Sequence, residues 1–230
     1  MDEGMGQIPI LGRLASAAVG ALLGSAIGGP AGGVVGAAAI PLMEAAIERD
    51  RRGMESVRSL ADQAAAQNHM TPDELAAHAQ SSDPRLNLAA VATRAAWNTL
   101  SQTKVDALAR VLAEGFADQA QLDRSWLLAC TIEELEAPHV RILAMMVRQP
   151  DLASAQGLLW DQSSLMRGLP ELASGIIPLM STLTRLGLTY LPGVYGGSGI
   201  GPWAHSEFGL EVLRYLSDMA QPTTDIPSTG

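Results

Sequence analysis

Cysteine is almost absent from this 230-residue chain, and its scarcity excludes two classes of protein. Cys130 is the sole cysteine, so the chain has neither an internal disulfide framework nor a zinc site built from cysteines. It ends the apolar run that begins at Trp126, which predicts a buried small hydrophobe rather than a reactive thiol. This cysteine usage fits a reducing, cytosolic location for the bulk of the chain.

Aromatic and charged residues are also scarce. Aromatic residues make up 4% and charged residues 17% of a chain that is 47% hydrophobic, so its core is predicted to be aliphatic. The length suits one large or two small domains with a proper core.

Positive charge is in deficit. Acidic residues outnumber basic ones by 24 to 15, which gives a formal net charge of −9, and Lys104 is the only lysine. A protein that holds nucleic acid through its phosphates needs basic patches, so the balance argues against a nucleic-acid partner.

Recognisable catalytic and ligand-binding motifs are missing. No His-Glu-x-x-His, P-loop or nucleophile-elbow pattern occurs, so we expect no enzyme, cofactor or metal site. Glu133, Glu134 and Glu136 form the densest acidic cluster. The spacing of Glu136 and His139 resembles a Glu-x-x-His metal pair, but Pro138 between them and the lack of a second copy favour a solvated helix end.

What the chain does have is a glycine zipper in residues 1–47. Residues 14–43 carry no charge, and within them glycine recurs at every fourth position. Residues four apart share one face of a helix, and a face without Cβ atoms lets two backbones approach closely. We predict helix packing through this face, which consists of Gly20, Gly24, Gly28, Gly32 and Gly36.

Several structures of this segment remain open. A secretory signal peptide is disfavoured, because Asp2 and Glu3 precede the apolar run. The run is long enough for one kinked membrane-spanning helix. A helical hairpin, in a membrane or inside a soluble oligomer, would turn at a hinge formed by Gly29, Pro30 and Gly33.

Residues 48–165 predict a helical bundle. Thr71, Pro72 and Glu74 form a capping box that starts a helix, and Asp83 with Pro84 starts another over residues 85–100. Further helices are expected over residues 103–117, 122–135 and 138–147. In the first of these an apolar stripe is formed by Val105, Leu108, Leu112 and Phe116, while Lys104, Asp106, Arg110 and Glu114 lie on its other sides.

Residues 166–220 have the element order of a winged-helix unit. A helix over residues 170–186 leads into a β-prone run at 186–191, a glycine-rich tip, and a closing helix capped by Ser206. The wing is assigned to Gly197, Ser198 and Gly199. The helix before it offers only Arg185 as a basic residue, which favours protein packing over DNA reading. Residues 221–230 predict a disordered tail.

Short stretches of the middle and C-terminal half resemble the abortive-infection alpha-type (Abi-alpha) proteins of bacteria. These stretches are ALARVLAEGF at 107–116, IEELEAPHVRIL at 132–143, LTRLGL at 183–188 and HSEFGLEVL at 205–213. The resemblance implies a helical pair followed by a winged-helix-like end, and a role in phage defence or host-cell arrest. It supplies no active-site residues, and the glycine zipper has no counterpart in it.

The sequence thus predicts a mainly α protein with a glycine-zipper helix or hairpin, a helical bundle and a small winged-helix-like unit. Our leading hypothesis is a self-associating, membrane-associated effector without enzymatic activity that binds a protein partner. If the segment spans a bacterial inner membrane, the three arginines in residues 49–52 leave the C-terminal bulk on the cytoplasmic side. The alternatives are a soluble oligomeric scaffold or adaptor in the cytoplasm and a winged-helix transcription regulator.

Overall fold

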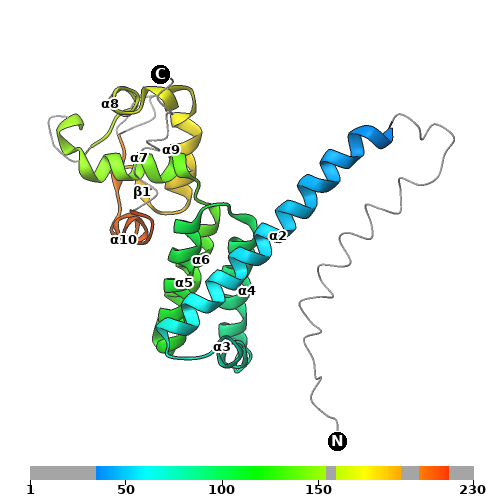
Figure 1. Ribbon diagram of the computed structural model, residues 1–230. Helices are drawn as coiled ribbons and strands as arrows, with labels where there is room; N and C mark the ends of the chain where they lie inside the picture. The colour runs from blue at the N-terminus through cyan, green and yellow to red at the C-terminus, as the bar shows by residue number, and fades with distance from the viewer. Residues whose placement is uncertain (1–34, 154–158, 193–201, 218–230) are drawn as a thin grey trace, which may run out of the picture. The chain divides into compact units, whose positions relative to one another are not determined.

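The structure of the protein is a computed structural model that describes residues 35–153, 159–192 and 202–217. The chain divides into two compact units, residues 1–50 and 51–230. In the first unit the described part is the beginning of helix α2. All other described elements belong to the second unit. The described residues are mainly helical, with one small antiparallel sheet (Figure 1).

Helix α2, Val35–Gln67, runs without a break through position 47, where the sequence placed a boundary. Its C-terminal part packs on the bundle through the buried side chains of Leu60, Ala64 and Ala65. The amide of Gln63 donates to Asp106 over 2.7 Å. Of the predicted zipper glycines, Gly36 lies in the first turn of α2. The others lie outside the described residues, as do the predicted hinge and wing.

The first short helix of the bundle starts at the capping box that the sequence predicted. Helix α3, Pro72–Ala79, has Thr71 as its N-cap and a complete capping box with Glu74. Helix α4, Asp83–Asn98, begins two residues before the predicted range of 85–100, with Ser82 rather than Asp83 at its N-cap position. Helix α5, Gln102–Ala117, and helix α6, Leu122–Glu134, flank the short 3₁₀ helix η1, Gln119–Gln121. Helices α4, α5 and α6 pack closely against one another (Figure 1).

Helix α5 is the centre of the bundle core. The predicted stripe of Val105, Leu108, Leu112 and Phe116 is buried, which confirms it. Lys104, which the sequence placed outside this stripe, is nevertheless buried. The residue is 3% exposed because its ammonium group has polar partners at the end of α6.

The C-terminal part of the chain folds as a second group of short helices. Helix α7, Ala137–Arg148, is followed by the 3₁₀ helix η2, Pro150–Leu152, and by helix α8, Gln162–Gly168. The helix predicted over residues 170–186 is divided into the 3₁₀ helix η3, Pro170–Gly175, and helix α9, Ile176–Arg185. The division falls at Gly175, a residue of low helix propensity.

A two-stranded antiparallel sheet joins α9 to helix α10, Glu207–Tyr215. Strand β1, Thr189–Tyr190, pairs with strand β2, Ala204–His205. Next to β2, Trp203 forms an isolated bridge with Trp160, and both side chains are buried. Ser206 caps α10 as predicted. Gly209 lets α10 approach the backbone, since a Cβ there would lie 2.3 Å from the Leu188 carbonyl oxygen.

Candidate functional site

The acidic cluster found in the sequence lies at the C-terminal end of α6, where the chain passes to α7. Each of its three carboxylates has a basic partner from a different element. We call this group the junction. It consists of Glu133 with Arg94, Glu134 with Arg185, and Glu136 with Lys104 and His139.

Glu133 binds Arg94 of α4 in a bidentate geometry. Arg94 Nε and Nη2 donate to the two carboxylate oxygens, each over 2.7 Å. Parallel charge-assisted bonds of this kind are stronger than neutral hydrogen bonds. The contact with Arg94 lowers the pKa of the Glu133 carboxyl and raises the pKa of the Arg94 guanidinium. The pair joins the last turn of α6 to α4.

Glu134 forms an ion pair with Arg185 at the end of α9. The contact raises the pKa of the Arg185 guanidinium. Both side chains are exposed, so water screens their attraction. The pair nevertheless links α6 of the bundle to α9.

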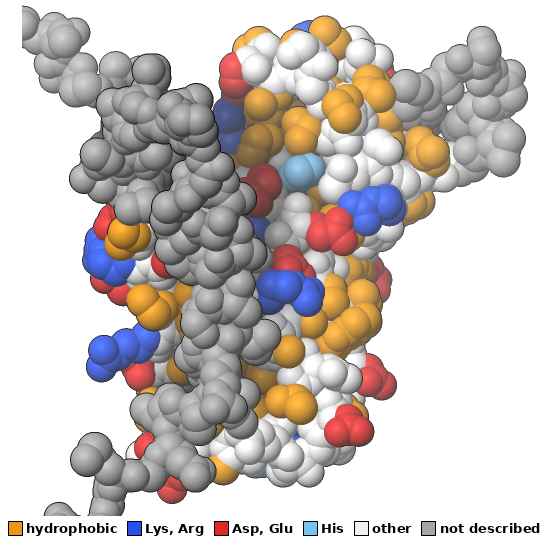
Figure 2. All heavy atoms as spheres, turned by 90° about the vertical axis from the view of Figure 1, so that its right-hand side faces the viewer, with side chains coloured by type: hydrophobic (Ala, Val, Ile, Leu, Met, Phe, Trp, Pro, Cys, Tyr) orange, Lys and Arg blue, Asp and Glu red, His pale blue; other side chains and the backbone are white. Residues whose placement is uncertain are grey.

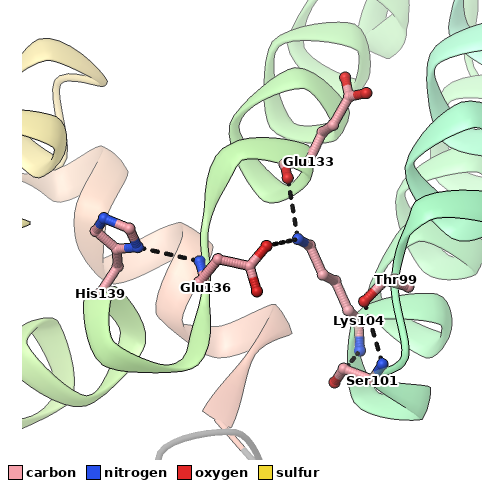
Figure 3. A network of polar contacts seen from close by, with 6 residues as sticks. All are labelled: Thr99, Ser101, Lys104, Glu133, Glu136 and His139. Carbon is pink, nitrogen blue, oxygen red and sulfur yellow. Dashed lines mark hydrogen bonds and ion pairs between the residues drawn. The ribbon is translucent and has the colours of Figure 1, made fainter.

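Lys104 of α5 occupies the middle of the junction (Figure 3). Its Nζ donates to the backbone carbonyl of Glu133 over 2.9 Å and lies 3.3 Å from Oε1 of Glu136. The last carbonyls of a helix have no partner within the helix, and a cation satisfies them and complements the helix dipole. Lys104 therefore caps α6 and at the same time holds the residue that precedes α7.

His139 holds the start of α7 from the other side (Figure 3). Its Nδ1 accepts the backbone N–H of Glu136 over 3.1 Å, so the neutral ring carries its proton on Nε2. Burial is the main cause that lowers the pKa of His139. Lys104 lowers the pKa further, and Glu136 opposes both effects. The histidine is thus a neutral acceptor at the third position of the helix.

The position of the junction explains why it needs these cations. A helix C-terminus carries partial negative charge, so carboxylates there are destabilising unless cations compensate. The compensating charges come from Arg94, Lys104 and Arg185, which lie on α4, α5 and α9. Figure 2 shows the same pattern on one face of the molecule, where blue and red side chains lie next to one another.

A second set of polar contacts links α10 to the bundle. Arg124 of α6 pairs with Glu211 over 2.5 Å, and Tyr215 donates its hydroxyl to Glu114 over 2.5 Å. Burial and the bond to Glu114 raise the pKa of Tyr215. Arg110 lies 5.7 Å above the Tyr215 ring and donates to the Tyr215 carbonyl over 3.3 Å. Together with the junction, these contacts attach the C-terminal helices to α5 and α6.

The junction does not have the chemistry of the metal pair whose spacing it resembles. His139 Nδ1 takes a backbone N–H, and the Glu136 carboxylate takes the Lys104 ammonium group. Among the described residues, no group of three or more metal-ligating side chains could hold a metal ion. The predicted helix end is present, because α6 ends at Glu134, and the side chains of Glu134 and Glu136 are exposed as well as paired.

Cys130 lies one turn before the junction on α6. It is half-buried rather than fully buried as the sequence predicted. Burial and then the charge of Glu133 raise the pKa of its thiol, with Arg94 acting in the opposite direction. A raised pKa keeps the thiol protonated at neutral pH, and the thiolate is the reactive form. The prediction of an unreactive side chain therefore agrees with its surroundings.

Sequence reasoning missed the arginine and lysine partners in the junction because they lie 29 to 51 positions from the residues they bind, whereas Glu136 and His139 are three positions apart. The one available signal was the single lysine, Lys104, on a helix that is otherwise apolar toward its core.

Comparison with protein-family models, curated proteins and solved structures found no match to this chain. In the part of the chain that the structure describes, no helix combines the length and the apolar character needed to cross a membrane.

Proposed function

We propose that this protein is a self-associating effector without enzymatic activity, which uses its N-terminal glycine zipper to pack against a second copy at a membrane. The observation that carries the proposal is the repeat of glycine at every fourth position from Gly20 to Gly36. Each glycine inside a helix costs about 1 kcal/mol in water relative to alanine. Five glycines on one helix face are therefore favoured only where close packing or an apolar solvent offsets that cost.

Helix α2 supports a coupling between this segment and the body of the protein. It contains Gly36 near its start and continues to Gln67, and its last turns are buried against the bundle. Arg49, Arg51 and Arg52 follow the apolar segment and are exposed on α2. Basic residues next to an apolar segment favour the cytoplasmic side of a membrane.

The C-terminal part supports a winged-helix-like unit that binds a protein partner. Helix α9, strand β1, strand β2 and helix α10 follow one another in the order of such a unit. The bridge between Trp160 and Trp203 adds a third chain segment beside β2. Arg185, the basic residue of α9, is bound to Glu134, which argues against α9 as a DNA-reading helix.

The resemblance to Abi-alpha proteins supports phage defence as the setting of this activity. Expression of the full chain in bacteria should reduce the plating efficiency of phage. The Gly24→Leu and Gly28→Leu variants should lose that protection if self-association through the zipper is needed. If these variants protect as well as the wild type, phage defence does not require self-association through the zipper.

Fractionation and size measurement of the full chain test the proposal directly. The protein should remain with membranes after a carbonate wash and enter solution with detergent. Recovery of the protein in the aqueous fraction would instead support the soluble oligomeric scaffold. In detergent, Gly24→Leu with Gly28→Leu should reduce the oligomer size. Ala26→Leu, half a turn away from the glycine face, is the matched control and should leave the size unchanged.

A further inference from the structure

The connection from α6 to α7 consists of Leu135 and Glu136, and through it the chain passes from the bundle to the C-terminal helices. Leu135 is buried, whereas Glu136 is exposed. Two contacts fix the backbone and side chain of Glu136. His139 accepts its N–H, and Lys104 binds its carboxylate. The Glu136 carbonyl also accepts the N–H groups of His139 and Val140, so one lysine and one histidine supply the side-chain contacts of the connection beside these backbone bonds.

The contact of His139 depends on its protonation state. Nδ1 can accept the Glu136 N–H only while it carries a lone pair, and both ring nitrogens of a protonated histidine are donors. Protonation therefore places two donors opposite each other. It also puts a positive charge in the first turn of α7, where the helix dipole is itself positive, and near the ammonium group of Lys104.

Few other charges act on His139. Glu136 and Lys104 are the charged groups that shift its pKa. Helices α9 and α10 and strand β2 pack against α7. Besides His139, the charged or titratable groups that they and α7 itself carry are Arg185, His205, Glu207, Glu211, Arg214, Tyr215, Arg141 and Arg148. Of these, Arg185 is bound to Glu134, Glu211 to Arg124 and Arg141 to Glu171.

We propose that His139 is a pH-sensitive lock on the α6–α7 connection, which holds the start of α7 while neutral and releases it on acidification. Lys104 assists the lock by binding Glu136 and by opposing a second positive charge nearby. The C-terminal helices would thereby gain freedom relative to α6 under acidic conditions. This inference does not depend on the proposed function.

The direction of the pH effect follows from the lowered pKa of His139. The unfolded chain binds a proton to this residue at a higher pH than the folded chain does. The contribution of the neutral histidine to stability is therefore complete above its ordinary pKa of 6.5 and is lost as the pH falls through the lower folded value. Release of the connection is expected in that acidic range.

Hydrogen–deuterium exchange of the full chain tests the lock. After correction for intrinsic exchange, the backbone amides of Glu136, His139 and Val140 should exchange about three to ten times faster at about pH 5 than at about pH 7. His139→Gln supplies an acceptor that does not titrate. Its exchange in this segment should not respond to pH. The control His69→Asn alters a histidine outside the junction and should keep the response.

Two results would overturn the proposal. One is a wild-type segment whose exchange does not change with pH, and the other is an equal pH response in His139→Gln. If His139→Gln folds poorly, an NMR measurement on the wild-type protein still tests the proposal. Nitrogen chemical shifts of the His139 ring should show the proton on Nε2 at neutral pH, and a proton on Nδ1 would contradict the lock.

Discussion

The ammonium group of Lys104 lies 2.9 Å from the backbone carbonyl oxygen of Glu133, at the end of α6. A lysine is rarely so deeply buried, because its charge loses the solvation of water. Here the carbonyl of Glu133 and the carboxylate of Glu136 replace part of that solvation. The contact therefore joins α5, α6 and the start of α7 through a single side chain.

Replacement of Lys104 by methionine should destabilise the fold. Lys104→Met keeps the apolar stem of the side chain but removes the donor to Glu133. We expect a loss of about 1–2 kcal/mol in the free energy of unfolding, measured by urea titration. Arg58→Met, at a side chain that is 85% exposed, is the control and should change stability by less than about 0.5 kcal/mol. A Lys104→Met protein as stable as the wild type would mean that desolvation of the ammonium group offsets its contacts.

Helix starts could be predicted from the sequence because their causes are local. Thr71 and Glu74 are three positions apart and cap each other, and Ser206 caps a helix that begins at the next residue. The apolar stripe of α5 was equally accessible, because its spacing matches the helix period. The β-prone run predicted at residues 186–191 contains a strand, but the strand is shorter than the run. Its paired part is reduced to Thr189 and Tyr190.

The ion pairs of the junction could not be predicted, because they join residues that are distant in sequence. Glu133, Glu134 and Glu136 were interpreted as a solvated cluster, and nothing near them in the chain reveals Arg94, Lys104 or Arg185 as partners. Charge alone does not distinguish an exposed acidic patch from a paired one. The distinction arises when tertiary packing brings α4, α5 and α9 to one end of α6.

Gly209→Ala should destabilise the C-terminal helices. The added Cβ would lie 2.3 Å from the carbonyl oxygen of Leu188, and backbone atoms cannot move aside as a flexible side chain can. We expect a loss of about 2–3 kcal/mol in thermal or urea unfolding. At Gly175 the nearest atom to an added Cβ is 3.6 Å away, so Gly175→Ala is the control. It should be neutral or slightly stabilising, and equal losses in both variants would exclude close approach as the cause.

His69→Gly should stabilise the protein. His69 follows α2 with a φ of 57°, a left-handed conformation that glycine adopts without a steric penalty. Relief of that strain should raise the free energy of unfolding by up to about 1 kcal/mol, after the entropy of the more flexible unfolded chain is subtracted. The reverse change Gly187→Ala, at a φ of 73° with open space around it, should lower it by a similar amount. A gain in Gly187→Ala would contradict the backbone explanation.

The Arg94–Glu133 pair should show measurable coupling, unlike a pair that is merely close on the surface. A double-mutant cycle with Arg94→Gln and Glu133→Gln should give about 0.5–1 kcal/mol, because the contact is bidentate and Glu133 is only 24% exposed. Arg58 and Asp62 form the control pair, 3.9 Å apart and 85% and 57% exposed. Their cycle should give a coupling energy near zero.

The same coupling energy should fall in acid. Because Arg94 lowers the pKa of the Glu133 carboxyl, the pair contributes fully above the ordinary pKa of 4.5, and its contribution is lost as the pH falls through the lower folded value. Urea unfolding of the four proteins in the cycle, repeated from neutral pH downward, measures this change. High salt should reduce the coupling only in part, since the two hydrogen bonds persist where long-range attraction is screened. A coupling energy that stays constant into strong acid would show that the contact does not require the ionised carboxylate.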